Sequence, residues 1–365
     1  MKVMTILGTR PEIIRLSLII PRLDQLCAHV LVHTGQNFDP TLSDRFFTEL
    51  KLRAPDHHLG VESASFGQQI GQIIERSEAL LKRESPDRLL ILGDTNSALS
   101  AIVAKRMGIP VFHMEAGNRC YDDRVPEEVN RRIIDHASDI LMPYTERSRD
   151  ALLREGVAAN RIFVVGNPIR EVLQHHALQP SAAIFDAVGA GAGRYLLATL
   201  HRAESVDHAD TLRAILQGFE EVGARHDLPL ILSVHPRTRA RLNTWKLGPF
   251  ARIKLHDPFG LTDFVTLMRN ARCVLTDSGT VQEECAILGV PNVTVRETTE
   301  RPETLECGSN ILAGTSTAGI ARAVDVVLSG KQRWTPPPEY LAENVSDIVT
   351  RIVLGHHLDL PSHPR

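Results

Sequence analysis

One segment places an acid, a hydroxyl and a glycine directly after an apolar run that is typical of a buried strand. The run at 273–276 is followed by Asp277, Ser278 and Gly279, and a helical pattern begins near residue 281. Such a turn leaves backbone N–H groups at the positive end of a helix, which suits an anion such as phosphate. Ser and Asp also cap helices that bind nothing, so an ordinary capped helix is an equal alternative.

Two glutamates, Glu283 and Glu284, follow that turn within the helical pattern. Carboxylates repel a bound phosphate, but they accept hydrogen bonds from sugar hydroxyls. A nucleotide would satisfy both features, with its phosphates on the turn and its ribose on a glutamate. Histidines near arginines at other predicted strand ends of this half of the chain also favour an anion, although a single histidine is more often structural. These basic residues are His201, Arg202, His235, Arg237 and, later, Arg301.

Acidic side chains mark the predicted strand ends in the first half of the chain. Asp94 follows the apolar run at 89–92, Glu115 follows the run at 111–114, and Glu127 opens the next helical pattern. Carboxylates that converge raise one another's pKa values, which is how a base is tuned towards neutrality. Each of them also has a simpler interpretation as a helix cap or as a first-turn acid that faces the helix dipole.

The first predicted strand ends in the sequence GTRPE, at 8–12. Pro11 suits the first turn of a helix, and Arg10 could hold two phosphate oxygens with its planar guanidinium group. The alternative is a solvated arginine at a helix start. Because ligands of open α/β sheets bind outside the carboxyl ends of the strands, we expect Arg10 to lie near the acids.

The elements that must position these side chains alternate along the chain. This alternation predicts an α/β fold in which parallel sheets carry helices on both faces. Strands are expected at 3–7, 30–33, 89–92, 111–114, 140–142, 162–165, 195–199, 230–234, 253–256, 273–276 and 292–295. Helices are expected at 11–26, 68–82, 98–107, 127–135, 146–155 and 340–354.

The alternation breaks at 174–193, which predicts a connection between two domains. We expect one Rossmann-like domain at 1–174, a second at 190–336, and a helix and tail at 337–365 that return to the first domain. The sequence GAGAG at 189–193 precedes a strand instead of following one, and the turn at 8–12 has a single glycine. Neither is a dinucleotide fingerprint, so no NAD and no other cofactor is expected.

Composition excludes several classes of protein. The chain has 365 residues, 43% of them hydrophobic and 23% charged, with a formal net charge of −3. These values are typical of a two-domain globular protein and argue against a dedicated nucleic-acid binder. Apolar runs are too short for a membrane span or a leader peptide, so we expect a cytoplasmic protein. The five cysteines form no C-x-x-C pair and no H-E-x-x-H occurs, so no metal site is expected.

Together these motifs resemble the non-hydrolysing UDP-N-acetylglucosamine 2-epimerases. The resemblance covers nearly the whole chain, and the order of the motifs makes it specific. It implies a fold like that of the GT-B glycosyltransferases, with a cleft between two domains, and a homodimer. The motifs are GTRPE (8–12), TGQ (34–36), GDT (93–95), EAG-x-R (115–119), PEE-x-NR (126–131), GN (166–167), HR (201–202), HPR (235–237), DSG-x-x-QEE (277–284) and TTERPE (298–303).

The resemblance also implies roles for individual residues. The catalytic group would consist of Asp94, Glu115, Glu127 and His201. Contacts to the UDP-sugar would come from Arg10, Arg15, Arg131, Arg202, Phe264, Ser278, Gly279, Thr280, Glu284 and Arg301. A second, allosteric substrate site would involve Gln36, Gln68 and His235.

The chain departs from the commonest family pattern at several positions. Arg15 replaces a frequent lysine, Thr280 replaces a glycine, Ser205 replaces an asparagine, and residues 37–39 differ next to the implied allosteric site. The segment GNRCYDDRVPEE at 117–128 is similar to a branch that acts on UDP-2-acetamido-2,6-dideoxy-L-hexoses, in the L-fucosamine pathway. The resemblance therefore implies the same reaction on either of two sugars.

The reaction implied by the resemblance is elimination of UDP to a glycal, followed by re-addition. Deprotonation at C2 alone would give an unstabilised carbanion, whereas departure of the diphosphate removes the excess electrons. Three alternatives remain: a GT-B glycosyltransferase, a hydrolysing relative and a non-catalytic UDP-sugar-binding regulator. The acids of the first half argue against the glycosyltransferase and the regulator, because neither needs a proton-transfer group there.

Overall fold

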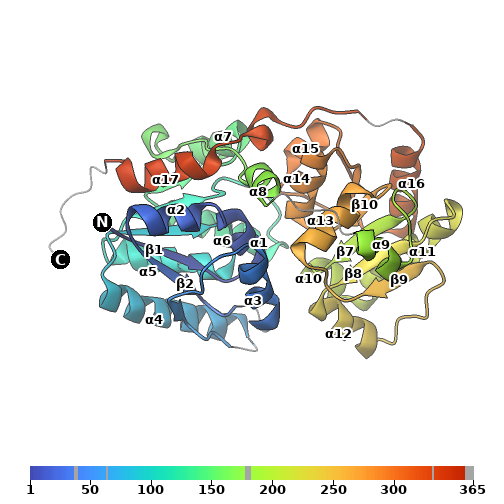
Figure 1. Cartoon of the computed structure of the whole chain (residues 1–365), viewed down its shortest axis with the longest axis horizontal. Coiled ribbons are helices and arrows are strands. Elements are labelled where there is room, and N and C mark those ends of the chain that lie inside the picture. The colour runs from blue at the N-terminus through green and yellow to red at the C-terminus, as the bar shows by residue number, and fades with distance from the viewer. Residues whose placement is uncertain (37–39, 63–64, 177–181, 331–332, 358–365) are drawn as a thin grey trace. The chain divides into compact units, whose positions relative to one another are not determined.

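The chain folds into two units in the computed structural model, which describes residues 1–36, 40–62, 65–176, 182–330 and 333–357 (Figure 1). Unit 1 comprises Met1–His176 and Glu339–Arg365, and unit 2 comprises Ala177–Pro338. Each unit holds one six-stranded parallel sheet. These two sheets confirm the predicted pair of Rossmann-like domains.

The sheet of unit 1 has the strand order β3-β2-β1-β4-β5-β6. This is the strand order of a doubly wound Rossmann sheet. From β1 the chain adds β2 and β3 on one side and then β4, β5 and β6 on the other, so the switch point lies between β1 and β4. At this switch point Val3, Met4 and Thr5 of β1 pair with 88–90 of β4. The strands are β1 (Lys2–Leu7), β2 (Ala28–His33), β3 (His57–His58), β4 (Arg88–Leu92), β5 (Val111–Met114) and β6 (Ile140–Met142).

Side-chain and backbone caps delimit the helices of unit 1. Ser65 accepts a hydrogen bond from the Gln68 N–H group at the start of α4, and Thr145 accepts one from Ser148 at the start of α7. The α-helices are α1 (Arg10–Leu16), α2 (Ile19–Leu26), α3 (Pro40–Glu49), α4 (Phe66–Glu84), α5 (Ser100–Arg106), α6 (Pro126–Ala137), α7 (Glu146–Arg154) and α8 (Ile169–His175). Two 3₁₀ turns are η1 (Asn96–Leu99) and η2 (Ala159–Arg161).

The last helix, α17 (Val345–Gly355), returns to unit 1 and packs against α2, as predicted (Figure 1). A 3₁₀ turn, η3 (Pro338–Leu341), precedes it. An ion pair joins Arg22 to Asp347 (3.1 Å), and the Ser346 N–H group donates to Glu171 (2.9 Å). Arg88 donates to the carbonyl of Val353, so the helix is tied to the start of β4 as well.

Unit 2 repeats the connectivity of unit 1. Its strand order is β12-β11-β10-β7-β8-β9. The chain adds β8 and β9 on one side of β7 and the later strands on the other, so the switch point lies between β7 and β10. The strands are β7 (Leu196–Leu200), β8 (Leu230–Val234), β9 (Ile253–His256), β10 (Val274–Thr276), β11 (Asn292–Thr294) and β12 (Asn310–Leu312). The helices are α9 (Ala182–Val188), α10 (Ala203–Val206), α11 (Ala209–Arg225), α12 (Pro236–Thr244), α13 (Leu261–Arg269), α14 (Gly279–Leu288), α15 (Pro302–Glu306) and α16 (Thr317–Leu328).

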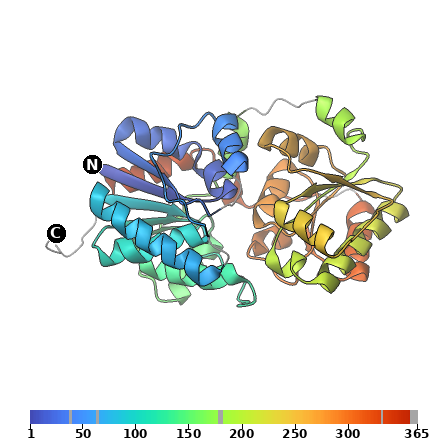
Figure 2. The same cartoon turned by 90° about the horizontal axis from the view of Figure 1, so that it is seen from below.

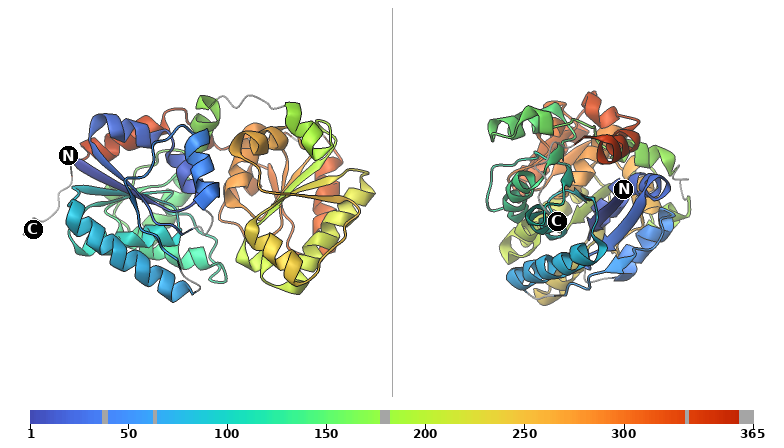
Figure 3. Two further views of the ribbon diagram at one scale, coloured as in Figure 1. Left: turned by 60° about the horizontal axis from the view of Figure 1, so that its bottom comes forward. Right: turned by 90° about the vertical axis from the view of Figure 1, so that its left-hand side faces the viewer.

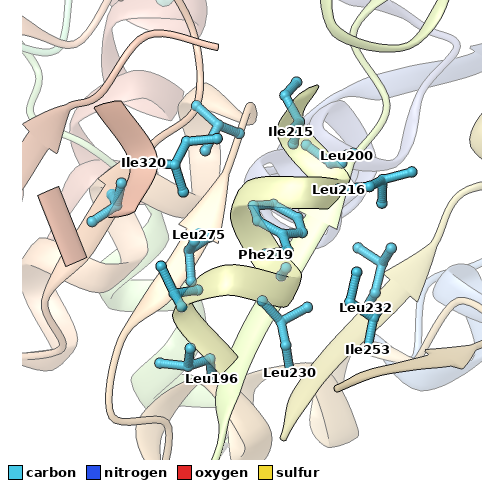
Figure 4. Close-up of a cluster of buried hydrophobic side chains, with 14 of the residues drawn as sticks. Leu196, Leu200, Ile215, Leu216, Phe219, Leu230, Leu232, Ile253, Leu275 and Ile320 are labelled. Atoms are coloured by element: carbon cyan, nitrogen blue, oxygen red, sulfur yellow. The ribbon is translucent and has the colours of Figure 1, made fainter. Parts of the chain in front are cut away.

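Both faces of each sheet are covered by helices (Figures 2 and 3). In unit 2, Leu196 and Leu200 of β7 face the core beneath α11 and α16, where Phe219 and Ile320 are fully buried (Figure 4). Leu197 belongs to the core on the opposite face. Because successive strand residues point to opposite faces, burial of both faces explains the nearly continuous apolar runs.

Some predicted elements were wrong in detail. Residues 162–165 form no strand of the sheet, and Ile162 makes only an isolated bridge to Leu141. The helix predicted at 11–26 is two helices, α1 and α2, and α14 begins at Gly279 instead of near residue 281. The short strands β3, of two residues, and β12, of three residues, were not predicted. In the part of the chain that the structure describes, no helix is long and apolar enough to cross a membrane.

Candidate active site

Several of the sequence-predicted site residues follow the strands at the switch points of the two sheets. In unit 1 the loops after β1 and β4 carry Arg10 and Asp94. In unit 2 the loops after β7 and β10 carry His201 and Ser278. Ligands of open α/β sheets bind outside the carboxyl ends of the strands at such points. Each unit therefore places these candidate residues at the sheet edge where ligands of such folds bind.

The turn after β10 is the start of helix α14. Ser278 is the N-cap residue, but its side chain does not cap the helix, and its hydroxyl lies 3.1 Å from that of Thr280. Gly279 is the first helical residue, and α14 has ten residues. The N–H groups of its first turn are thus not capped by Ser278, as expected for a turn that receives an anion.

Asp277 joins this turn to the end of β7. Its buried carboxylate accepts hydrogen bonds from the N–H groups of His201 and Arg202, both at 2.9 Å, and lies 3.2 Å from Nδ1 of His201. Burial would raise the pKa of Asp277, but the His201 imidazole and these hydrogen bonds lower it to about 2. Asp277 is therefore a carboxylate at neutral pH, and it orients His201.

Glu300 lies against the helix start and gathers two arginines. Its carboxylate pairs with Arg202 (3.1 Å) and with the buried Arg296 (2.8 Å). A Cβ atom at Gly279 would lie 2.5 Å from Oε1 of Glu300, so a side chain there would have to displace this carboxylate. Arg202, predicted to contact substrate, thus pairs with an acid inside unit 2.

Other predicted substrate residues of unit 2 lie on α13, α14 and α15. Arg301, the N-cap residue of α15, is buried, and its Nε lies 2.5 Å from Glu283 of α14. Glu284 is buried on the same helix, and Phe264 is a half-buried residue of α13. His235, the N-cap of α12, has its ring 5.8 Å from that of His201.

In unit 1 the acid at the end of β4 is held by an arginine of α6. Nε and Nη2 of Arg131 both lie 2.8 Å from Oδ2 of Asp94. The same guanidinium group pairs with Glu128 (2.7 Å), which is fully buried and also accepts the N–H groups of Cys120 and Tyr121. Arg131, predicted to bind substrate, is therefore a fixed partner of Asp94.

The second acid, Glu115, lies just past β5 with a positive φ of 63°. Such a conformation is uncommon for a residue with a side chain and points to a functional constraint. Its carboxylate accepts from Asn118 (3.3 Å) and lies 3.8 Å from Nε of the buried Arg15. The third acid, Glu127, is half-buried in the first turn of α6.

A buried histidine connects the loops of Asp94 and Glu115. Nε2 of His113 lies 2.9 Å from the Gly93 carbonyl, and Nδ1 lies 2.9 Å from Asp135. Asp135 also accepts the Gly117 N–H group (3.1 Å) and pairs with Arg119 (2.8 Å). Burial would raise the pKa of Asp135, but its hydrogen bonds and the charges of His113 and Arg119 lower it.

The remaining predicted residues of unit 1 lie around the turn at 8–12. Arg10 lies 5.7 Å from the ring centroid of Phe46, and burial lowers the pKa of its guanidinium group. Gln36 accepts hydrogen bonds from the N–H (3.0 Å) and hydroxyl (2.9 Å) groups of Ser97, whereas Gln68 belongs to the first turn of α4. Residues 37–39, which depart from the family pattern, lie outside the described residues.

Comparison with known proteins identifies the family. A family model described as UDP-N-acetylglucosamine 2-epimerase matches residues 22–354. The UDP-N-acetylglucosamine 2-epimerase of Methanocaldococcus jannaschii is 42% identical over 349 residues, covering 92% of this chain and 95% of the relative. The chain belongs to the UDP-N-acetylglucosamine 2-epimerase family.

A solved structure and a second relative of this family extend the comparison. A crystal structure of the M. jannaschii enzyme in complex with UDP-GlcNAc and UDP has a TM-score of 0.91 and 40% identity, covering 96% of this chain and 99% of that one. A UDP-2,3-diacetamido-2,3-dideoxy-D-glucuronate 2-epimerase of Pseudomonas aeruginosa is 36% identical over 318 residues, covering 86% of this chain and 88% of the relative. The similarity to the structure also confirms the expected GT-B-like fold.

Several buried acids at the site of this family member were not among the predicted site residues. They lie within the recognised motifs or a few residues from them, but a motif does not tell which of its acids points inward. Their burial and their partners distinguish them in the structure. They are Glu12, Glu128, Asp135, Asp277 and Glu300.

The chemistry available in each unit differs. Unit 1 offers carboxylates at strand ends, which can accept and donate protons. Unit 2 offers a helix start that the Ser278 side chain does not cap, an oriented histidine and an anchored arginine, which can stabilise negative charge. Among the described residues no group of three or more His, Cys, Asp or Glu side chains could hold a metal ion.

Proposed function

We propose that the protein interconverts a UDP-N-acetylhexosamine with its C2 epimer, as between UDP-N-acetylglucosamine and UDP-N-acetylmannosamine. The observation that carries this proposal is the match to UDP-N-acetylglucosamine 2-epimerases over residues 22–354. The solved relative bound to UDP-GlcNAc and UDP supports the same class of substrate. No cofactor is needed, because the proposed reaction moves a proton without a net change of oxidation state.

The proposed mechanism is elimination and re-addition. A carboxylate of unit 1 takes the C2 proton, the C1–C2 double bond forms, and the C1–O bond breaks with its electron pair going to UDP. In the return step an oxygen of the diphosphate adds to C1, and a proton reaches C2 from the opposite face. Asp94, Glu115 and Glu127 are the proposed proton-transfer residues. Inversion requires two differently placed proton-transfer groups, which a cluster of acids can supply.

We assign UDP to unit 2 and the reacting carbon atoms to unit 1. The α14 helix start with Ser278 and Gly279 would hold the diphosphate, and Glu284 would bind the ribose. His201, held by Asp277, would stabilise the charge that develops on the leaving diphosphate. Arg10 is the residue of unit 1 that we propose for the same charge, and Phe264 is proposed for the uracil.

The sugar itself is the least constrained part of the proposal. A related 2-epimerase that is 36% identical acts, by its name, on a different UDP-sugar, so identity at this level does not fix the substrate. The similarity of residues 117–128 to another branch makes UDP-2-acetamido-2,6-dideoxy-L-talose a second candidate, giving UDP-N-acetyl-L-fucosamine. We also propose a homodimer and a cytoplasmic location, as in the sequence analysis.

The test is a proton NMR time course in D₂O with each of the two candidate UDP-sugars. Epimerisation with deuterium incorporated at C2 of the product is expected for the native substrate. Epimerisation that leaves C2 protiated would exclude the elimination mechanism. Release of free sugar would instead indicate a hydrolysing enzyme, and no reaction without an acceptor would favour a glycosyltransferase.

A variant of the proposed base completes the test. Asp94→Asn is expected to lower kcat by about 100-fold or more, the usual size of an acid–base contribution. Glu78→Gln, which removes a carboxylate that pairs with Lys82 on the surface of α4, is the matched control and should keep wild-type kcat. An active Asp94→Asn enzyme would remove Asp94 from the proton-transfer group.

A further inference from the structure

A fully buried carboxyl group, Glu12, lies at the switch point of unit 1. Its Oε2 accepts hydrogen bonds from the Gly8 N–H group (3.1 Å) and the Thr9 hydroxyl (2.7 Å). Its Oε1 accepts one from the Thr95 hydroxyl (3.3 Å). Gly8 and Thr9 directly precede Arg10, and Thr95 directly follows Asp94. One carboxyl group therefore joins the turn of the proposed phosphate ligand to the turn of the proposed base.

Helix capping accounts for only part of this arrangement. A threonine followed three residues later by a glutamate is the pattern of a capping box, in which the threonine side chain accepts from the helix N–H groups. Here Glu12 does accept the Thr9 N–H group, as in a capping box, but the Thr9 side chain caps no helix N–H group and donates to Glu12 instead. The bond from Thr95 comes from a different strand end, and a cap does not require it. Glu12 thus connects two loops that are adjacent only because β1 pairs with β4.

The environment of Glu12 places opposing demands on its charge. Burial raises the pKa of Glu12 to about 7, although hydrogen bonds from Thr9, Gly8 and Thr95 favour the carboxylate. Keeping an ionisable group here is unfavourable for stability, and glutamine could cap the helix without a charge. A carboxyl group that accepts at both oxygens, from two separate turns, indicates a use beyond capping.

We propose that Glu12 is a positioning residue for the epimerisation, which holds the Arg10 turn and the Asp94 turn in a fixed relation by accepting hydrogen bonds from both. The proposal rests on the proposed function. Glu12 itself does not take part in proton transfer; it acts through Asp94. The Thr95 hydroxyl is the link on which this action depends.

The hydrogen-bond geometry predicts what glutamine would do at this position. The Gly8 N–H group can only donate, so the amide oxygen of Glu12→Gln must remain on that side. Its NH₂ group would then face Thr95, whose hydroxyl would have to accept instead of donate. The Asp94 turn would shift, and a displacement of about 1 Å near the reacting groups can lower the rate by about 100-fold. We expect kcat to fall by about 10- to 100-fold, with a smaller change in KM.

The experiment uses Glu12→Gln, Thr95→Val and their double variant, with Thr95→Ser as the variant that keeps the hydroxyl. Thr95→Val should lower kcat as Glu12→Gln does, the double variant should lose little more, and Thr95→Ser should restore most of the rate. Glu78→Gln again serves as the control. If Glu12→Gln fails to fold, the kcat values of Thr95→Val and Thr95→Ser still show whether the Thr95 hydroxyl is needed.

Equal rates for Thr95→Val and wild type, or equal losses in the Val and Ser variants, would overturn the proposal. Additive losses of kcat in the double variant would overturn it too, because independent residues add. Failure of the proposed function gives a different result, since the wild-type protein would then convert no UDP-sugar. In that case urea unfolding of the two single variants and the double variant still tests the link. Shifts of the unfolding midpoint that do not add would show that Glu12 and Thr95 interact.

Discussion

Two fully buried carboxyl groups, Glu12 and Asp277, show how neighbouring atoms decide the charge of a residue. Burial disfavours both carboxylates. For Glu12 this effect prevails, and the pKa is raised to about 7. Asp277 accepts two backbone N–H groups and faces the His201 imidazole, so its pKa is lowered to about 2. The proposed base and the proposed phosphate site thus each lie beside a buried acid. The pKa of Glu12 is near neutrality, whereas Asp277 is ionised except in strong acid.

The lowered pKa of Asp277 predicts a loss of stability in acid. A carboxyl group whose pKa falls on folding stabilises the native state above its unfolded value of 3.8, and this contribution disappears as the pH falls towards 2. The expected contribution is about 2 kcal/mol. Urea unfolding followed by tryptophan fluorescence measures it, because the only two tryptophans, Trp245 and Trp334, both belong to unit 2.

Asp277→Asn is the comparison for this prediction. It keeps one oxygen for the N–H groups but cannot ionise, so its unfolding free energy should fall less than that of the wild type between pH 5 and pH 3. Asp210→Asn, at an exposed position of α11, is the control and should follow the wild type. Parallel pH profiles for wild type and Asp277→Asn would show that the carboxylate contributes nothing.

At the scale of elements, the start of α14 is defined by what crowds it. Gly279 is needed because the Glu300 carboxylate occupies the space of a side chain, and Glu300 is fixed by Arg202 and Arg296. The start of α14, the loop after β7 and the segment before α15 therefore pack against one another. A change at the glycine must disturb both arginines.

Gly279→Ala is expected to weaken UDP binding by about 10-fold or more, since overpacking a buried position costs about 1–3 kcal/mol. The added methyl group would lie 2.5 Å from Oε1 of Glu300, and this oxygen cannot move without breaking its ion pair with Arg202. Titration calorimetry with UDP measures the effect. Gly191→Ala, where no atom lies within 4 Å of the added carbon, is the matched control. Unchanged affinity in Gly279→Ala would argue against UDP at this helix start.

The sequence predicted the elements better than their pairing. Alternating apolar runs identified ten of the twelve strands of the two sheets, because strands buried on both faces have a strong apolar signal. The edge strand β3 was not predicted, because two residues carry no periodicity. The edge strand β12 was not predicted either, although β6, β10 and β11 are equally short. The strand predicted at 162–165 was wrong. This run is apolar, but it lies beyond the edge strand β6 and makes one isolated bridge to it.

The motifs located the site, but not the direction of each side chain. Glu283 and Glu284 look equivalent in sequence, yet adjacent helical residues point about 100° apart. The structure shows that Glu283 pairs with Arg301. Likewise Glu128, next to the predicted Glu127, is the one that is fully buried. Such choices depend on long-range partners that no local pattern contains.

At the scale of the whole chain, the same strand order occurs twice, but the two units differ in continuity. Unit 2 is one continuous segment, Ala177–Pro338, whereas unit 1 needs the segment that follows it. Helix α17 supplies Val345, Val349 and Val353, all fully buried, beside α2. Unit 1 is therefore built from two segments of the chain, one before unit 2 and one after it.

Val349→Ala is expected to destabilise unit 1 by about 2 kcal/mol, the usual loss when a buried aliphatic side chain is truncated. Circular dichroism should then show an earlier unfolding step, while tryptophan fluorescence, which reports unit 2, keeps its wild-type midpoint. Arg351→Ala on the same helix is the control, because that side chain is 80% exposed. A shift of the fluorescence midpoint by the same amount would mean that the two units unfold together.

The discontinuity of unit 1 has a consequence for biosynthesis. On the ribosome the first 176 residues emerge without α17, and all of unit 2 is translated before that helix appears. Domains usually fold in the order in which they are made. In this chain the later unit has all its strands and helices first, and the earlier one waits with the apolar face of α2 uncovered. Chaperones that bind exposed apolar helices would therefore meet the N-terminal half of the nascent chain, and translation speed through unit 2 would set how long it stays open.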